Sequence, residues 1–210
     1  MKTIVEKLKI DDKIEDKYKY HPKDKEELLE VIKTITKSID NYSDRKNANF
    51  NEIDTSRITD MSYLFKDFKY IEKIHIEEWD VSHVKNMKGI FAGCNEFNCD
   101  LSDWDVLKVE DMSYMFDGCY SFNSDLSKWK VSNVRNMDYM FRKCSHFNSD
   151  ISKWDIKKVR SMGWMFDQCY NLEQDLSGWN IDKVKTVSGI FRDCSKMESE
   201  KRPKKNLIKK

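Results

Sequence analysis

The sequence lacks long apolar runs, has few glycines and prolines, and carries almost no net charge. No stretch approaches the roughly 20 apolar residues of a membrane span. Lys and Glu interrupt the first ten residues, where a secretory signal needs about 7–15 apolar residues in a row. We therefore expect a protein without a membrane span that is cytoplasmic as written.

Charge and motif content also exclude several function classes. Lys and Arg number 38 against 37 Asp and Glu, so the net charge of +1 gives no overall attraction to nucleic acid, which is not an expected partner. Six glycines build no phosphate-binding loop, and the four histidines and six cysteines show no zinc-ligand spacing. We expect no enzymatic activity, no catalytic residue, no metal site and no cofactor.

The sequence does contain a repeat with a period of 25 residues. Each copy has a tryptophan, a phenylalanine and a cysteine at fixed places, and the first copy, near Ile53, is imperfect and one residue out of phase. A fixed period of this size indicates stacked copies of one small unit whose apolar side chains form a shared core. The predicted core columns include Trp79, Trp104, Trp129, Trp154 and Trp179; Cys94, Cys119, Cys144, Cys169 and Cys194; and Phe116, Phe141 and Phe166.

The spacing within one copy predicts a strand followed by a helical turn. Trp129 and Val131 are two residues apart, as on one face of a strand, whereas Val134, Met137 and Met140 follow at intervals of three, as in a 3₁₀ turn. The predicted fold class is α/β: a right-handed, leucine-rich-repeat-like solenoid of about six coils, each with a short parallel strand and a short helical turn, behind an N-terminal helical cap.

Three segments are expected along the chain. Residues 1–50 hold an N-terminal segment and the capping helix, which follows Pro22, with Asp24 as its N-cap and Glu27 as the capping-box partner. Residues 51–196 form the repeat, and residues 197–210 form a basic tail that we expect to be disordered. Leu207 and Ile208 in this tail are candidates for a small C-terminal cap.

The repeat resembles that of a known family. The string Met-x-x-Met-Phe-x-x-Cys-x-x-Phe-Asn-x-Asp-Leu-Ser-x-Trp, from Met112 to Trp129, is similar to the 25-residue repeat of the BspA-like, leucine-rich-repeat-related bacterial surface proteins. The similarity extends over about residues 53–194. It implies a solenoid used for attachment or protein binding, often at a cell surface, which is the alternative location to the cytoplasm.

Several repeated positions allow more than one interpretation. The tryptophans favour a core ladder over an exposed stacking platform, and the column cysteines favour buried thiols over disulfides. Cys99, outside the column, is expected to be a partly exposed thiol. The column of Asp100, Asp125, Asp150 and Asp175 favours turns whose carboxylates accept backbone N–H bonds, although stacked carboxylates are also a possible Ca²⁺ site.

The residues that flank each tryptophan vary between copies and are expected to face outward. Their charge changes from acidic to basic along the stack, so they form either a partner-binding strip or a merely solvating surface. The candidate strip residues are Asp103, Asp105, Lys128, Lys130, Lys153 and Asp155. The predicted function is a non-enzymatic protein-interaction or adhesion scaffold, expected to be monomeric, with an unidentified protein partner. The alternative is glycan or nucleic-acid binding through exposed tryptophans and the basic tail.

Overall fold

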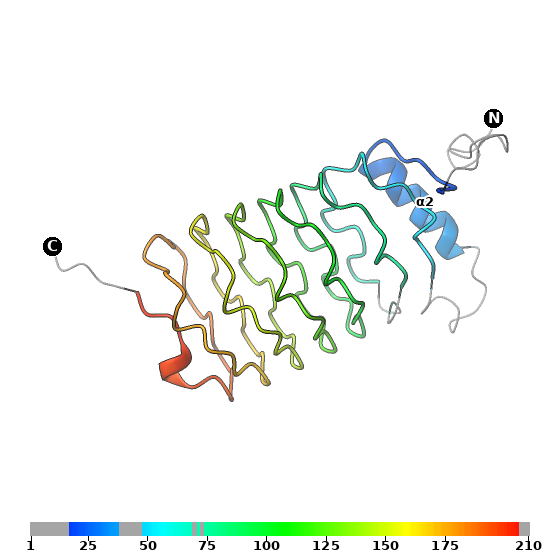
Figure 1. The fold of residues 1–210 in the computed structure, drawn as a ribbon. Coiled ribbons are helices and arrows are strands. Elements are labelled where there is room, and N and C mark those ends of the chain that lie inside the picture. Colours follow the sequence, from blue (N-terminus) through cyan, green and yellow to red (C-terminus); the bar gives the residue numbers. More distant parts are fainter. Residues whose placement is uncertain (1–16, 38–47, 69–70, 72–73, 206–210) are drawn as a thin grey trace.

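The computed structural model describes residues 17–37, 48–68, 71 and 74–205. Helix α2 (Lys25–Lys37) lies at one end of the molecule, and beyond it the chain forms a row of coils that lie side by side (Figure 1). One coil corresponds to one copy of the sequence repeat. The short 3₁₀ helix η1 (Ser199–Lys201) follows the last coil.

Helix α2 begins where its capping residues predict. The backbone N–H of Glu27 donates to Oδ1 of Asp24 at 3.0 Å, and the backbone N–H of Lys23 donates to Oε2 of Glu27 at 2.9 Å. This reciprocal pair satisfies two N–H groups that a helix start leaves without partners, and it confirms the predicted capping box. Three residues of the apolar face are buried in the same core as the repeats: Leu28, Val31 and Ile32.

Each coil is a series of tight turns. In the coil that starts at Leu126, the N–H of Trp129 donates to the carbonyl of Leu126 at 3.1 Å, and that of Val134 donates to Val131 at 2.9 Å. The same three-residue bond recurs further on, where the N–H of Cys144 donates to Phe141 at 3.0 Å. Every bond closes a turn between two inward-facing side chains, which explains the apolar spacing of three.

Backbone hydrogen bonds also join each coil to the next in parallel register. One bridge position recurs in all six coils, at Asp60, Asn86, Asp111, Asn136, Ser161 and Thr186. Beside it, the N–H of Met137 donates to Ser161 of the following coil at 2.9 Å, and that of Phe141 donates to Met165 at 2.9 Å. These bonds stack the equivalent positions on one another.

The predicted α/β leucine-rich-repeat-like solenoid is wrong. Among the described residues, the structure contains one α-helix, which precedes the repeat, the short η1, and isolated parallel bridges without any strand. No helical segment occurs in the coils from residue 48 to residue 198, apart from positions 69–70 and 72–73, which lie outside the described residues. The physical reason is that the chain turns every few residues, so no run stays extended long enough for a strand, and the three-residue spacing belongs to successive turns.

Two columns of left-handed backbone help to bend each coil. Tyr139 and Lys143 have φ angles of 60° and 62°, and the equivalent residues of the other coils are also positive. L-residues adopt this region at a cost of about 1–2 kcal/mol, whereas glycine adopts it freely. Four of the six glycines of the chain occupy these two columns: Gly89, Gly93, Gly118 and Gly189.

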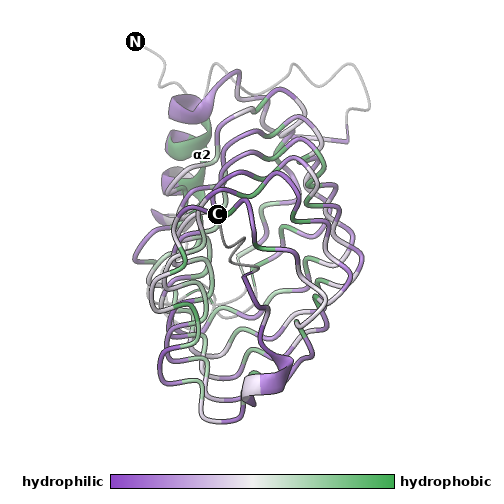
Figure 2. Ribbon diagram, turned by 90° about the vertical axis from the view of Figure 1, so that its left-hand side faces the viewer, coloured by the Kyte–Doolittle hydropathy of each residue, from purple (hydrophilic) through white to green (hydrophobic). Residues whose placement is uncertain are grey.

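The core is a continuous ladder of stacked rings. The rings of Phe116 and Phe141 lie 5.6 Å apart with an interplanar angle of 11°, and those of Phe141 and Phe166 lie 5.7 Å apart at 1°. Figure 2 shows that apolar and polar segments alternate around each coil, as expected when turns direct some side chains inward and others outward. Each layer of the core is therefore shared between two coils.

The described part of the C-terminal segment contacts the last coil. The N–H of Leu176 donates to the carbonyl of Lys201 at 2.9 Å, and Nζ of Lys205 donates to the carbonyl of Val184 at 2.8 Å. For residues 197–205 this differs from the expected disorder, because the end of the stack offers backbone carbonyls and N–H groups that need partners. Leu207 and Ile208 lie outside the described residues.

Candidate interaction surface

The six strip residues lie on the outer surface. Asp103, Asp105, Lys128, Lys130, Lys153 and Asp155 are all exposed, whereas the tryptophan between each flanking pair is buried. The coil register places equivalent residues in a row along the stack, so the structure brings the six together on one face. Nζ of Lys128 lies 3.4 Å from Oδ1 of Asp103 in the preceding coil, and both side chains remain more than half exposed.

Two of the strip carboxylates also stabilise their own turns. Oδ1 of Asp105 accepts the N–H of Leu107 at 3.1 Å, and Oδ1 of Asp155 accepts the N–H of Lys157 at 3.2 Å. Lys130 occupies the same column without such a bond, so the position tolerates either charge. The strip therefore combines two turn-forming carboxylates, the exposed pair of Asp103 and Lys128, and two further lysines.

The tryptophan column lies in the core. The five side chains are 3–5% exposed, and the indole Nε1 of Trp129 donates to the carbonyl of Leu101 at 2.9 Å. Nε1 of Trp154 donates in the same way to Leu126 at 3.1 Å. Buried indoles offer no face on which a base or a sugar could stack, so a stacking platform has no structural basis here.

The thiols of the cysteine column are also buried and make hydrogen bonds that join neighbouring coils. Sγ of Cys144 donates to the carbonyl of Phe116 at 3.0 Å, and each other column thiol bonds to the preceding coil in the same way. Burial raises the pKa of the Cys144 thiol well above its usual value, and it raises that of Cys194 to about 11. Neutral, buried thiols are poor nucleophiles and poor metal ligands.

Cys99 is also buried, contrary to the sequence-based expectation. It is 7% exposed, and its Sγ lies 3.2 Å from the carbonyl of Ile74. The residue replaces a serine of the repeat at a place where the side chain points toward the preceding coil. The serines of that column, Ser124 and Ser149, similarly use their Oγ to accept the N–H of Leu101 and of Leu126.

The aspartate column forms turns. Oδ1 of Asp125 accepts the N–H of Ser127 at 2.9 Å, and Oδ1 of Asp150 accepts that of Ser152 at 3.0 Å. These serines lower the pKa of both carboxyl groups, because their hydrogen bonds stabilise the charged form. Within the described residues, no group of three or more His, Cys, Asp or Glu side chains could hold a metal ion.

A row of stacked side chains on the surface, which the sequence did not reveal, follows the left-handed column of Tyr139. The rings of Tyr114 and Tyr139 stack at 4.7 Å, and the guanidinium of Arg142 lies 5.1 Å from the centre of the Tyr139 ring. Arg142 also makes two 2.7 Å bonds to Asp117 of the preceding coil. The alternation of Asp and Arg at the repeat position of Arg142 is the sequence feature that could have predicted these contacts.

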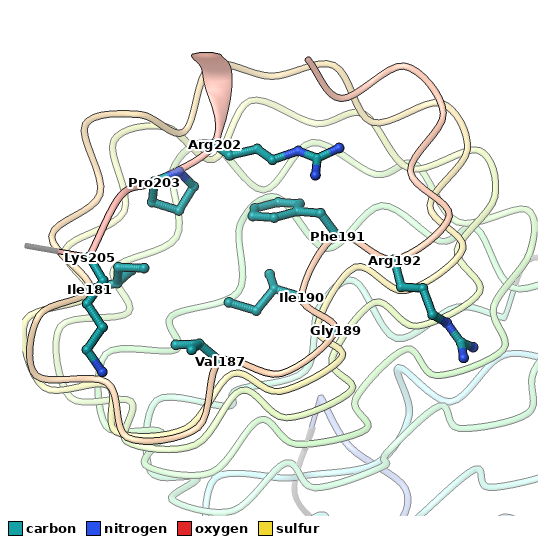
Figure 3. A pocket seen from close by; sticks show the side chains of 9 residues that line it. All are labelled: Ile181, Val187, Gly189, Ile190, Phe191, Arg192, Arg202, Pro203 and Lys205. Atoms are coloured by element: carbon teal, nitrogen blue, oxygen red, sulfur yellow. The ribbon is translucent and has the colours of Figure 1, made fainter. Parts of the chain in front are cut away.

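A hollow opens at the C-terminal end of the stack, on the outer side of the last described coil. This pocket of about 490 Å³ is lined by apolar side chains of the last coil and by the chain that crosses it. Figure 3 shows Arg202 beside the ring of Phe191, with Pro203 and Lys205 across the hollow. Val187 occupies the repeat position of the methionine of the other coils, and its smaller side chain lines the pocket.

The sequence match to a known family agrees with this repeated architecture. The family described as Mycoplasma protein of unknown function, DUF285, matches residues 33–144 and 124–205. The chain belongs to the DUF285 family. Comparison with curated proteins gives no match. Membership supports the general prediction that the chain belongs to a bacterial repeat family. The match does not assign the chain to the leucine-rich-repeat or BspA-like proteins.

Membership of the DUF285 family assigns no activity, and its two matched ranges together span the coils and the C-terminal end of α2. Neither helix in the described part of the chain is long and apolar enough to cross a membrane. The site that remains as a candidate is the exposed strip beside the tryptophan column.

Proposed function

We propose that this DUF285 protein is a non-enzymatic scaffold that binds a protein partner through the strip of Asp103, Asp105, Lys128, Lys130, Lys153 and Asp155. The supporting observation is the contrast within each coil: inward positions repeat the same residue, whereas the exposed positions beside the tryptophan change charge from coil to coil. A rigid ladder that varies only on its surface presents a charge pattern that a partner can recognise.

The finer family relationship belongs to the same proposal. The string from Met112 to Trp129 resembles the repeat of BspA-like surface proteins, for which attachment and protein binding are implied. We infer a shared way of using the repeat, as a binding surface made of stacked coils, rather than a shared leucine-rich-repeat fold.

The test exchanges the charges of the strip without changing the net charge. The variant carries Asp103→Lys, Asp105→Lys, Lys128→Asp and Lys130→Asp, and each new residue type already occurs in a neighbouring coil at the same column or beside it. The control carries Glu173→Lys and Lys196→Glu, two exposed residues away from the strip. Each protein is used as bait in lysate from the source cells, and captured proteins are quantified by mass spectrometry.

We expect at least one captured protein to be lost by about tenfold with the strip variant and retained with the control, because like charges would then oppose the partner. Equal recovery of every captured protein by both variants would remove the strip as the binding face. Both variants should keep the wild-type melting temperature within about 2 °C, since exposed substitutions change stability little.

A further inference from the structure

A second charged surface runs along the stack beside the column of buried valines. Val84, Val109, Val134, Val159 and Val184 all face the core. The residues immediately before and after each valine therefore point outward, and the first coil has an isoleucine, Ile58, in the same place. We name these outward positions the basic ridge; its charged members are Arg57, Lys85, Lys108, Glu110, Arg135, Lys158, Arg160, Lys183 and Lys185.

The ridge concentrates positive charge that the whole-chain balance conceals. It contains eight Lys or Arg residues and a single acid, Glu110, for a net charge of seven. The whole chain has a net charge of +1, so the remainder of the molecule carries a net charge of −6. Stacking the coils has therefore separated charges that alternate along the sequence.

Most of these cations have no ionic partner within the described part of the chain. Nε of Arg135 lies 3.6 Å from Glu110, and Nζ of Lys158 donates to Asn133 at 2.6 Å. Arg160 donates to backbone carbonyls. The described residues provide no ion pair for the other five: Arg57, Lys85, Lys108, Lys183 and Lys185. Their charges are available to an external anion.

The shape of the ridge limits what that anion can be. Coils repeat at about 4.8 Å, so the ridge is two side-chain columns wide and about 24 Å long. Carboxylates border part of its length, with Asp80 and Asp105 on one side and Asp60 and Asp111 on the other, all toward the N-terminal end of the stack. These carboxylates would weaken the binding of a planar anionic membrane or a nucleic-acid duplex.

Single-stranded nucleic acid is also a poor fit. Proteins that bind such strands place aromatic side chains along the basic groove so that the bases can stack on them. The ridge positions include no Phe, Tyr or Trp, and the tryptophans of the neighbouring strip are buried. The ridge offers charge along a line and no surface for a base.

The length and the net charge of the ridge suit an extended acidic polypeptide. An extended peptide advances about 3.3–3.4 Å per residue, so about seven residues span about 24 Å, and seven carboxylates would balance the net charge of the ridge. We propose that the basic ridge binds an extended run of about seven Asp and Glu residues, laid along the stack. The ridge shares no residue with the strip, so the proposal goes beyond the function proposed above and does not depend on it.

The experiment uses a defined probe and the intact chain. A fluorescein-labelled peptide of eight glutamates is titrated with the protein, and fluorescence anisotropy is recorded at about 50 and about 200 mM salt, since electrostatic binding weakens as salt screens the charges. A peptide of eight glutamines serves as the uncharged control. The ridge variant carries Lys158→Glu, Lys183→Glu and Lys185→Glu.

The matched control variant carries Lys128→Glu, Lys130→Glu and Lys153→Glu, which changes the net charge by the same amount on the strip. We expect the ridge variant to weaken binding about tenfold or more and the strip variant to weaken it less than about threefold, because screening confines the effect to nearby charges. A second ridge variant, Lys85→Glu with Lys108→Glu, tests the other end and should also weaken binding.

Three results would overturn the proposal. These are absence of binding to the glutamate peptide at low salt, equal weakening by the ridge and strip variants, and tighter binding to a single-stranded oligothymidine or to phosphatidylserine vesicles than to the peptide. Melting temperatures of all variants establish that each is folded. A negative result here leaves the strip test unaffected, because the two experiments change different residues.

Discussion

The middle and last coils carry a tryptophan and a phenylalanine at the same repeat positions, but in different surroundings. In the middle coil, Nε1 of Trp129 donates to the carbonyl of Leu101 at 2.9 Å. In the last coil, Trp179 is 3% exposed, but its Nε1 finds no acceptor among the described residues. One amino acid at one repeat position therefore has its hydrogen bond satisfied in one coil and missing in another.

The phenylalanine column shows the same difference. Phe141 is fully buried and stacks on the phenylalanines of the coils before and after it. Phe191 is only partly buried, stacks on Phe166 at 5.6 Å, and lines the terminal pocket. The comparison teaches that the contribution of a core residue depends on its neighbours on both sides, because each apolar layer is completed by the next coil.

The largest expected difference is between two tryptophan substitutions. Trp129→Ala should lower the free energy of unfolding by about 3–5 kcal/mol, since it removes a large buried ring and leaves a cavity. Trp179→Ala should cost at least about 1 kcal/mol less, because that indole has no hydrogen bond to lose. Urea titration of both variants measures the difference. Equal losses would mean that the last coil is packed as completely as the middle one.

Two glycines provide the next contrast. A Cβ on Gly89 would lie 2.5 Å from two ring carbons of Tyr63, and φ there is +56°, so Gly89→Ala should cost about 2–3 kcal/mol. A Cβ on Gly178 in the last coil meets nothing within 4 Å, so Gly178→Ala should be neutral or stabilise by about 0.4–1 kcal/mol. Thermal unfolding followed by circular dichroism checks both. A harmless Gly89→Ala would contradict the ring placement.

Replacing Met by Val in the middle coil and Val by Met in the last coil should have opposite effects on the free energy of unfolding. Met137→Val removes buried volume from the middle coil and should cost about 1 kcal/mol. Val187→Met adds volume where the terminal pocket is open and should stabilise by about 0.5–1 kcal/mol. Denaturant midpoints of the two variants and of the double variant test this. Destabilisation by Val187→Met would show that the pocket is already filled.

The smallest predicted effect is the loss of the charged aspartate in a turn, and it should be the same in the middle and last coils. Asp125 and Asp175 each accept the N–H of a serine two residues later, and hydrogen bonds from the side chain and backbone of that serine lower the pKa of both carboxyl groups. Because the folded pKa is lowered, the stabilisation is present above the unfolded value of about 3.9 and is lost as the pH falls through the folded value.

Asp125→Asn and Asp175→Asn should therefore each lower the melting temperature slightly at pH 7 and match wild type near pH 2. The amide oxygen still accepts the serine N–H, so the turn itself is retained. Melting curves from pH 7 to pH 2 provide the measurement. A larger effect in the middle coil would show that this turn also depends on the neighbouring coil.

The helix and the shared core could be predicted because their signals are local or strictly periodic. Asp24 and Glu27 mark the start of α2 through a bond between near neighbours in sequence. The 25-residue interval places Trp129 and Phe141 in register with their copies, and apolar residues in register are buried when the copies stack.

The path of the chain within a coil could not be predicted from the same signals. Spacing by two at Trp129 and by three at Met137 suits a strand and a 3₁₀ turn as well as it suits consecutive tight turns. Tyr139 and Trp164 adopt positive φ, which local propensity would reserve for glycine, because inter-coil hydrogen bonds hold the backbone there. Backbone conformations that contacts between coils impose on single residues leave little trace in the sequence.

The strip and the basic ridge also differ in how well the sequence alone predicts them. The strip was predictable because each of its residues is next to a core tryptophan and so must face outward. The basic ridge was not identified, because its lysines and arginines are separated in sequence by carboxylates that belong to other columns. Only the coil register shows which charges become neighbours.

The period, the number of coils and the identity of the shared core follow from the sequence, because a 25-residue apolar pattern can be buried only by equivalent neighbours. The stacked structure is needed to show that the coils are made of turns, that a pocket lies at the last described coil, and that a chain with a net charge of +1 carries a basic ridge. The physical reason is that stacking at about 4.8 Å brings together residues 25 positions apart, and neither propensity nor composition records those contacts.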